Sequence, residues 1–328
     1  MGRPNCIWFS NAWSLPKLIV GRDQLYSGGF GGGRFALIKV KVETDPATFR
    51  RSANPFLLER PSANQLVFDL AQRIESFSDI PSDRIMWIAI DDIGKIHGVA
   101  LRTDPKHSLI LSEMGEEALG AIVDGALAIE GLDGVLAVKE TAQLFQKKWG
   151  ALCSKPLSDR MHLRLYDATS TTPPAASPGH SRVATSLDLE LLSAWSLAFA
   201  RESLGSSEND LAPYRKDMEK CIREGREWVW EVEGEVCAMA VWTGKNELGT
   251  KITGVYTPVR LRGRGFASNL VCMMTERLLA DGAPRAFIFT DLKNPTSNSI
   301  YQNVGYKHVC DFIHFGIEKT PAALVEGK

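Results

Sequence analysis

A short turn rich in arginine and glycine constrains the fold of this chain more than any other feature of its sequence. The turn, Arg260 to Ala267, directly follows the apolar run Ile252 to Tyr256, which is predicted to be a strand. Beyond the turn, apolar residues recur at helical spacing in one stripe: Ala267, Leu270, Val271, Met274 and Leu278. Glycines let several backbone N–H groups converge on one anion, and the N-terminus of a helix adds a favourable dipole. Strand, turn and helix together predict a diphosphate site.

A second motif lies downstream, where Asn294-Pro295-Thr296-Ser297-Asn298-Ser299-Ile300-Tyr301 precedes Gly305-Tyr306. With Val255-Tyr256-Thr257-Pro258 and the glycine turn, it resembles the GNAT superfamily of acyl-CoA N-acyltransferases over roughly residues 182–319. The acyl-CoA motif of that family, Gln/Arg-x-x-Gly-x-Gly/Ala, fits two registers here: Arg262-x-x-Gly265-x-Ala267 and Arg260-x-x-Gly263-x-Gly265. We prefer the first, because it places the apolar helix stripe where such proteins have it.

The resemblance implies that acetyl-CoA is the cosubstrate, that no metal takes part, and that the acyl group passes directly to an amine. In the family the pantetheine arm pairs with the motif strand where it splays from the next strand, here residues 286–289. Ordinary strand pairing is equally compatible with the sequence at Val255 and Thr257. The expected cofactor-binding residues are Val255, Tyr256, Thr257, Arg262, Gly263, Arg264, Gly265, Phe266, Ala267, Asn294, Ser297 and Tyr301.

Tyr301 is the candidate catalytic residue. Asn294, Ser297 and Tyr301 share one helix face, whereas Ile300 and Val304 are expected to make the buried face. This spacing predicts that Tyr301 points away from the core toward the thioester sulfur, where a phenol can protonate the departing thiolate. A packed aromatic side chain is the alternative for Tyr301. A helix N-cap before Pro295 is the alternative for Asn294.

No general base is identified from the sequence. Glu231, Glu233 and Asp291 are candidates, although each also fits a solvated charge, and a chain of water molecules would serve as well. The isolated His308 and His314 fit structural positions.

Composition and charge limit the classes of protein to which this chain can belong. The chain has 328 residues, of which 44% are hydrophobic and 23% charged, with a formal net charge of -1. This predicts two globular domains and argues against binding to RNA, DNA or an anionic membrane. The six cysteines form no CxxC pair, which is compatible with a reducing cytoplasm. The longest apolar runs are too short to span a membrane.

The two halves repeat one order of elements, which predicts an α/β (α+β) fold of two GNAT-like domains, each a mixed, mostly antiparallel sheet flanked by helices. We expect a leader at residues 1–34, a degenerate domain at 35–167, a linker at 168–181, a catalytic domain at 182–320 and a tail at 321–328. In the first half the turn corresponding to the glycine turn is Ser112 to Glu117, whose three carboxylates would repel a diphosphate.

The expected elements follow from hydrophobic periodicity and turn residues. Helices are predicted at residues 46–76, 116–129, 141–149, 187–200, 211–224, 267–280 and 297–304. Strands are predicted at residues 35–42, 86–90, 96–101, 108–111, 135–138, 161–166, 228–232, 236–242, 252–256 and 286–289, and near Val309 and Phe315.

These features together predict an acetyl-CoA-dependent N-acetyltransferase that acts on a small-molecule amine. The alternatives are a non-catalytic acyl-CoA-binding regulatory module and an acetyltransferase that acts on a protein amine. We expect a monomer, in which the two domains form a pseudo-dimer, or a homodimer. The first domain is expected to complete the acceptor pocket or to scaffold the pseudo-dimer.

Overall fold

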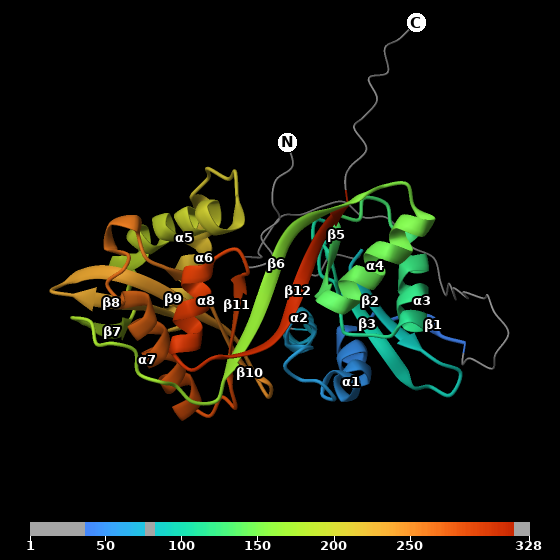
Figure 1. The fold of residues 1–328 in the computed structure, drawn as a ribbon, viewed down its shortest axis with the longest axis horizontal. Coiled ribbons are helices and arrows are strands. Elements are labelled where there is room, and N and C mark those ends of the chain that lie inside the picture. The colour runs from blue at the N-terminus through green and yellow to red at the C-terminus, as the bar shows by residue number, and fades with distance from the viewer. Residues whose placement is uncertain (1–36, 76–82, 318–328) are drawn as a thin grey trace, which may run out of the picture. The chain divides into compact units, whose positions relative to one another are not determined.

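The computed structural model describes residues 37–75 and 83–317. The predicted leader and tail lie outside these residues. The chain contains two repeats with the same order of elements, and the predicted fold class is confirmed (Figure 1). The first repeat comprises β1 (Lys39–Val42), α1 (Pro46–Leu57), α2 (Gln65–Glu75), β2 (Ile85–Ile90), β3 (Ile96–Arg102), β4 (Leu109–Leu111), α3 (Glu116–Leu127), β5 (Gly134–Val138), α4 (Lys139–Leu152) and β6 (Leu157–Ala168).

The second repeat comprises β7 (His180–Val183), α5 (Leu189–Leu204), α6 (Ala212–Arg223), β8 (Glu227–Val232), β9 (Glu235–Asn246), β10 (Gly249–Tyr256), α7 (Phe266–Ala280), β11 (Ala286–Asp291), α8 (Pro295–Asn303) and β12 (Lys307–Ile317). Strand β7 was not predicted. The two strands predicted near Val309 and Phe315 are one continuous strand, β12, and the predicted helix at 46–76 is interrupted between α1 and α2.

The last strand of each repeat runs from one compact unit into the other. Residues 165–309 form one unit, called here the C-terminal unit, and residues 37–164 with 310–317 form the N-terminal unit. In the N-terminal unit the residues of β12 from Phe312 to Gly316 pair antiparallel with β5, so the last strand of the chain completes that sheet. The end of β6 lies in the C-terminal unit, where it neighbours β11.

The sheet of the N-terminal unit has the order β1-β2-β3-β4-β5-β12. Its strand pairs are antiparallel except for β4 and β5, which are parallel. Helices α3 and α4 pack on this sheet through a core that includes Leu119, Ile122, Phe145 and Trp149.

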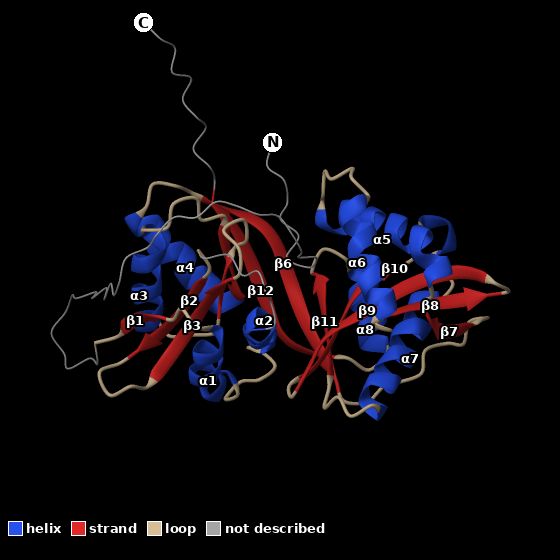
Figure 2. Cartoon of the chain, turned by 180° about the vertical axis from the view of Figure 1, so that it is seen from behind, coloured by secondary structure: helices blue, strands red, loops and turns tan. Residues whose placement is uncertain are grey.

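The sheet of the C-terminal unit continues from the end of β6 through β11-β10-β9-β8 to β7. Helices α7 and α8 cover one face and α5 and α6 cover the other (Figure 2). Four of the five residues in the stripe predicted for α7 are buried in the core on the α7 face, namely Leu270, Val271, Met274 and Leu278, and the fifth, Ala267, is half-buried. The core on the α5 face is separate and includes Leu192, Trp195, Met218, Val229 and Met239.

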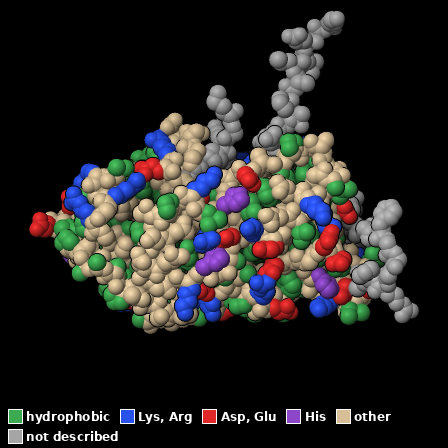
Figure 3. Space-filling view, viewed as in Figure 1, with side chains coloured by type: hydrophobic (Ala, Val, Ile, Leu, Met, Phe, Trp, Pro, Cys, Tyr) green, Lys and Arg blue, Asp and Glu red, His purple; other side chains and the backbone are tan. Residues whose placement is uncertain are grey.

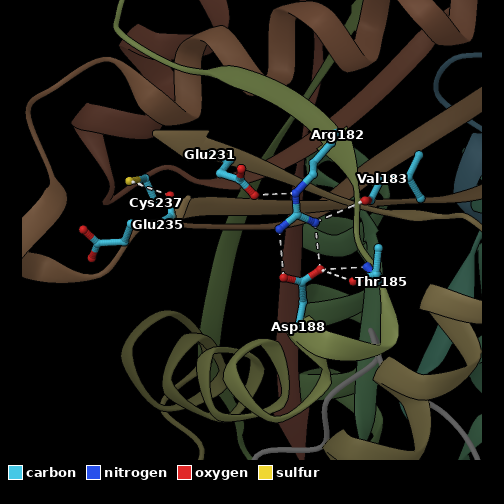
Figure 4. Close-up of polar contacts among 7 residues, drawn as sticks. All are labelled: Arg182, Val183, Thr185, Asp188, Glu231, Glu235 and Cys237. Atoms are coloured by element: carbon cyan, nitrogen blue, oxygen red, sulfur yellow. Dashed lines mark hydrogen bonds and ion pairs between the residues drawn. The ribbon is translucent and has the colours of Figure 1, made fainter. Parts of the chain in front are cut away.

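One arginine fixes the edge strand β7 within the C-terminal unit. The guanidinium of Arg182 donates to Glu231 on β8 at 2.6 Å and to both carboxylate oxygens of Asp188 at 2.8 and 2.9 Å (Figure 4). Asp188 also accepts the backbone N–H of Thr185 and ends the 3-10 turn before α5. The contact with the two carboxylates raises the pKa of Arg182 and lowers that of Asp188. Arg182 thereby joins β7, β8 and the start of α5.

The predicted linker contains no helix or strand between residues 169 and 179, yet it is held against α7. Asn269 donates its side-chain amide to the carbonyl of Ala175 at 3.0 Å, and Thr171 donates its hydroxyl to Glu276 at 2.8 Å. Trp230 on β8 donates to the carbonyl of Pro178 at 2.8 Å. The segment therefore passes over the outward side of α7 in a fixed path.

On the face of the molecule shown in Figure 3, basic and acidic side chains are interspersed. None of the helices in the described ranges is long and apolar enough to cross a membrane. Within the same ranges, no group of three or more His, Cys, Asp and Glu side chains is arranged to hold a metal ion.

Candidate active site

Strands β10 and β11 separate before either strand ends. They pair in parallel from Thr250 and Ala286 only as far as Ile252 and Ile288, while β10 continues to Tyr256. On its other edge β10 carries a β-bulge against β9 after Thr253. Gly254 lies within this bulge with a φ of 60°, a left-handed value that glycine adopts without strain. The separation opens the sheet at the place implied by the resemblance.

The turn after β10 presents a cluster of free backbone donors. Gly263 and Gly265 have φ values of 77° and 79°, and Gly265 is the N-cap of α7. The N–H groups from Gly263 to Ser268 donate no hydrogen bond to any residue in the described part of the chain, and the first helical bond runs from Asn269 to Gly265. The first turn of a helix leaves such groups unpaired. Because they are consecutive and lie at the positive end of α7, they suit an anion.

The three arginine side chains of the turn differ in whether they already bond to other residues of the protein. The guanidinium of Arg262 donates to Glu202 and, at 2.9 Å, to the carbonyl of Thr257. Arg260 pairs with Glu235 at 2.7 Å. Among the described residues no ion pair involves Arg264, which is exposed. Of the three arginines, Arg264 is therefore the one available to a ligand.

The side chains of two aromatic residues in the predicted set are buried. Phe266 is 4% exposed and packs in the core on the α7 face. Tyr256 packs in the other core and donates its hydroxyl to Glu202 at 2.8 Å. Burial, together with this carboxylate, raises the pKa of Tyr256 to about 12. The guanidinium of Arg262 lies 5.7 Å from the centre of the Tyr256 ring. Val255 and Ala267 are half-buried.

The N-cap interpretation of Asn294 is confirmed, because its side-chain oxygen accepts the backbone N–H of Ser297 at 3.1 Å. A contact between Asn294 and a ligand stays a prediction.

The predicted direction of Tyr301 is wrong. Tyr301 is 6% exposed, whereas Ile300 is half-buried, because α8 packs on the sheet through positions 301 and 304. The ring of Tyr301 lies 6.4 Å from that of Tyr166 and 6.1 Å from that of Tyr306. Burial raises the pKa of Tyr301, and a hydrogen bond with Ser297 opposes this effect. The phenol is therefore protonated at neutral pH.

Of the carboxylates considered as bases, two accept hydrogen bonds within the protein and the third is exposed to solvent. Glu231 accepts from Arg182. Glu233 is exposed in the β8–β9 turn with a φ of 50°. Asp291 accepts the backbone N–H of Lys293 at 2.8 Å.

Sequence reasoning missed Glu227, the first residue of β8. Glu227 is 1% exposed, and its Oε1 has no hydrogen-bond partner among the described residues. Burial raises the pKa of this carboxyl to about 8. The position of Glu227 could have indicated its burial, since it lies two residues before the fully buried Val229 and thus on the same face of β8.

The corresponding turn of the first repeat has a different geometry. Gly115, at the N-cap of α3, has a φ of -75°, so no left-handed glycine occurs there. Glu113 pairs with Arg60, and Glu116 in the first turn of α3 pairs with Lys148 at 3.2 Å. Glu117 is exposed beside them. Carboxylates at this helix N-terminus take the place that a bound anion would need.

Comparisons with known proteins agree with this architecture. Residues 231–313, which include the glycine turn and α8, match the family model described as FR47-like protein. None of the curated proteins compared matches the sequence. A GCN5-related N-acetyltransferase from Sphaerobacter thermophilus is 11% identical, with 85% of this chain and 95% of that chain covered and a TM-score of 0.56. A GNAT-family acetyltransferase from Colwellia psychrerythraea is 13% identical, with coverages of 85% and 100% and a TM-score of 0.52.

A tandem GNAT protein from the clavulanic acid biosynthesis pathway is also similar. It is 10% identical, with 87% of this chain and 99% of that chain covered and a TM-score of 0.53. At these identities the likeness shows the fold alone, and that fold is a tandem pair of GNAT repeats. The family model matches residues 231–313, the segment with the glycine turn, and the fold of the chain is similar to that of tandem GNAT proteins.

Proposed function

We propose that this protein is an acetyl-CoA-dependent N-acetyltransferase and that its C-terminal unit carries the active site. The observation that carries the proposal is the run of unpaired backbone N–H groups from Gly263 to Ser268, next to the strands β10 and β11 where they separate. The diphosphate of an acyl-CoA fits such donors, and the separated strands leave main chain for the pantetheine arm.

The residues present fit an acyl-CoA. The N–H groups of the glycine turn hold the diphosphate, and the exposed Arg264 adds one positive charge. The main chain of Val255 and Thr257 orients the pantetheine arm. When bound, the cosubstrate supplies the acyl group and a thiol leaving group.

Tyr301 is the proposed general acid. Its burial keeps the proton on the phenol at neutral pH, and a phenol in this state gives its proton to a sulfur that leaves as thiolate. Its position on α8, about two turns beyond the N-cap Asn294, is that of the tyrosine in the motif of the family.

The acceptor that we propose is a small-molecule amine. The N-terminal unit does not bind acyl-CoA in this proposal, since the turn before α3 has carboxylates and no left-handed glycine. We place the protein in the cytoplasm, a proposal supported by the free thiols of Cys153, Cys221, Cys237, Cys272 and Cys310.

Two measurements test this function. Calorimetric titration with acetyl-CoA is expected to show one site in the full chain, abolished by Gly265→Asp and unaffected by Gly115→Asp, its counterpart in the first repeat. Thioester consumption is then followed with a panel of amines. Binding without consumption by any amine would indicate the regulatory module instead. Consumption only with peptide amines would indicate a protein acceptor.

A further inference from the structure

A small cavity lies between helices α5 and α6 and the sheet of the C-terminal unit. Its lining is apolar except for a serine, a cysteine and a carboxyl, and consists of Ser196, Phe199, Met218, Cys221, Glu227, Met239, Val241 and Gly254. The centre of a water molecule can range over about 10 Å³ in it, which is roughly the room that one water needs.

The cavity contains a buried carboxyl oxygen without a protein partner. Glu227 is 1% exposed, and its Oε1 meets no hydrogen-bond donor in the described part of the chain. An unpaired buried polar atom costs free energy, so a buried carboxyl oxygen without a partner calls for a physical explanation. Pairing with water or with a substrate group removes this cost.

The same cavity reaches the bulge of β10. Gly254, which lines it, follows the last residues that join β10 to β11, so it lies where the two strands have separated. Residue pairing across β8, β9 and β10 brings Glu227 into one row with Val241 and Thr253. The carboxyl therefore approaches the separated strands from the α5–α6 face, while the glycine turn and Tyr301 lie on the α7–α8 face.

We propose that Glu227 is the proton acceptor for the amine substrate, reached through water in this cavity, an inference that rests on the proposed function. The carboxylate of Glu227 then acts from the α5–α6 face of the sheet, while acyl-CoA binds at the α7–α8 face.

Every proton transferred in the proposed reaction can be accounted for. The ammonium of the acceptor gives one proton through water to the carboxylate of Glu227, and the nitrogen then bonds to the acyl carbon. The carbon–sulfur bond breaks, Tyr301 gives its proton to the sulfur, and the amide nitrogen returns its second proton to Tyr301. Glu227 finally releases its proton to solvent, so that one proton is released for each amide formed.

Few charges influence Glu227. Arg226, the preceding residue, favours its ionised form but is itself bonded to Glu224 and to the carbonyl of Trp242. From α6, the thiol of Cys221 has a pKa raised to about 11 by burial and therefore stays neutral, and Asp217 acts on that thiol. From α5, the cavity receives Ser196 and Phe199, neither of which is charged. Little nearby positive charge therefore offsets the free-energy cost of ionising the buried carboxyl of Glu227.

The test compares the wild type with Glu227→Gln, which keeps the shape and removes the charge. We expect kcat for an amine to fall by about 10²- to 10³-fold, with unchanged affinity for acetyl-CoA. The ratio of wild-type to variant kcat/KM should increase with pH and level off above about pH 8, because this ratio cancels the titration of the amine. Glu227→Ala should regain turnover with formate, which a merely structural role of Glu227 does not predict.

Two further readouts keep the proposal falsifiable. Without acetyl-CoA, infrared difference spectra of wild type against Glu227→Gln should show a protonated carboxyl that titrates near pH 8. Glu233→Gln, an exposed carboxylate in the next turn, is the matched control and should keep wild-type rates. Equal rates and pH profiles in Glu227→Gln and wild type would overturn the role of Glu227 while leaving the acetyltransferase intact. A wild type that consumes no thioester would overturn the proposed function itself.

Discussion

The buried carboxyl of Glu227 makes the stability of this protein depend on pH in a direction opposite to that of most acidic residues. Its pKa is raised from an ordinary 4.5 to about 8 in the folded chain. Between these values the folded state holds a proton that the unfolded state has lost. Stability is therefore highest below pH 4.5 as far as this group is concerned, falls as the pH increases, and reaches its minimum above pH 8.

The magnitude follows from the linkage relation. From pH 6 to pH 9 the unfolded carboxyl stays ionised while the folded one gives up its proton. The two pKa values then give a loss of about 2.7 kcal/mol in the free energy of unfolding. Glu227→Gln carries no titrating group at this position, so it should lack this loss and be the more stable protein at pH 9.

Urea unfolding followed by tryptophan fluorescence at pH 6 and pH 9 measures both free energies. Because other groups titrate in both proteins, the quantity to report is the difference between wild type and Glu227→Gln. If that difference does not change between the two pH values, Glu227 is not protonated in the folded chain, and burial does not raise the pKa of this carboxyl.

The remaining predictions concern the turn, the bulge, the general acid and the edge strand. Gly265→Asp should abolish acetyl-CoA binding in calorimetry, whereas Gly265→Ala, which has the same left-handed strain but no charge, should bind more weakly yet measurably. Tyr301→Phe should lower kcat by about 10²- to 10⁴-fold with unchanged acetyl-CoA affinity, and unaltered turnover would remove Tyr301 from the mechanism. Gly254→Ala places a Cβ 3.2 Å from a methyl of Val241 at a left-handed φ, so turnover should fall while acetyl-CoA still binds. Arg182→Ala removes the cation that pairs with Glu231 and Asp188 and should lower the free energy of unfolding by about 2 kcal/mol in urea titrations.

Most helices and strands could be predicted because their patterns depend on residues that lie close together in the sequence. The stripe of α7 depends on spacing, and strands β8 and β9 were predicted from two apolar runs on either side of a turn; the structure has these elements at nearly the predicted residues. The four-residue strand β7 has no such pattern. It pairs with β8 along all four residues, and Arg182 joins it to Glu231 and Asp188. Because β8 lies far from β7 in the sequence, these contacts cannot be read from the residues of β7 alone.

Contacts between distant segments limited what the sequence indicated about the site. The direction of Tyr301 depends on the ring of Tyr166, which arrives from the end of the first repeat. The linker shows the same effect, since its residues have no periodic pattern yet lie fixed on α7 through Asn269 and Glu276. Helical spacing defines which residues share a face, but a partner from elsewhere decides which face is buried.

The division of the site between the two faces of one sheet follows from the separation of β10 and β11. A continuous sheet would keep the α5–α6 and α7–α8 layers apart, because paired strands leave no passage between them. The pairing stops at Ile252 and Ile288, and the bulge at Gly254 follows at once. Backbone donors at the start of α7 lie on one side of this opening, and the buried carboxyl of Glu227, whose Oε1 has no partner among the described residues, lies on the other. In the function that we propose, acyl-CoA therefore binds on the side of the backbone donors, and the proton of the amine leaves on the side of the carboxyl.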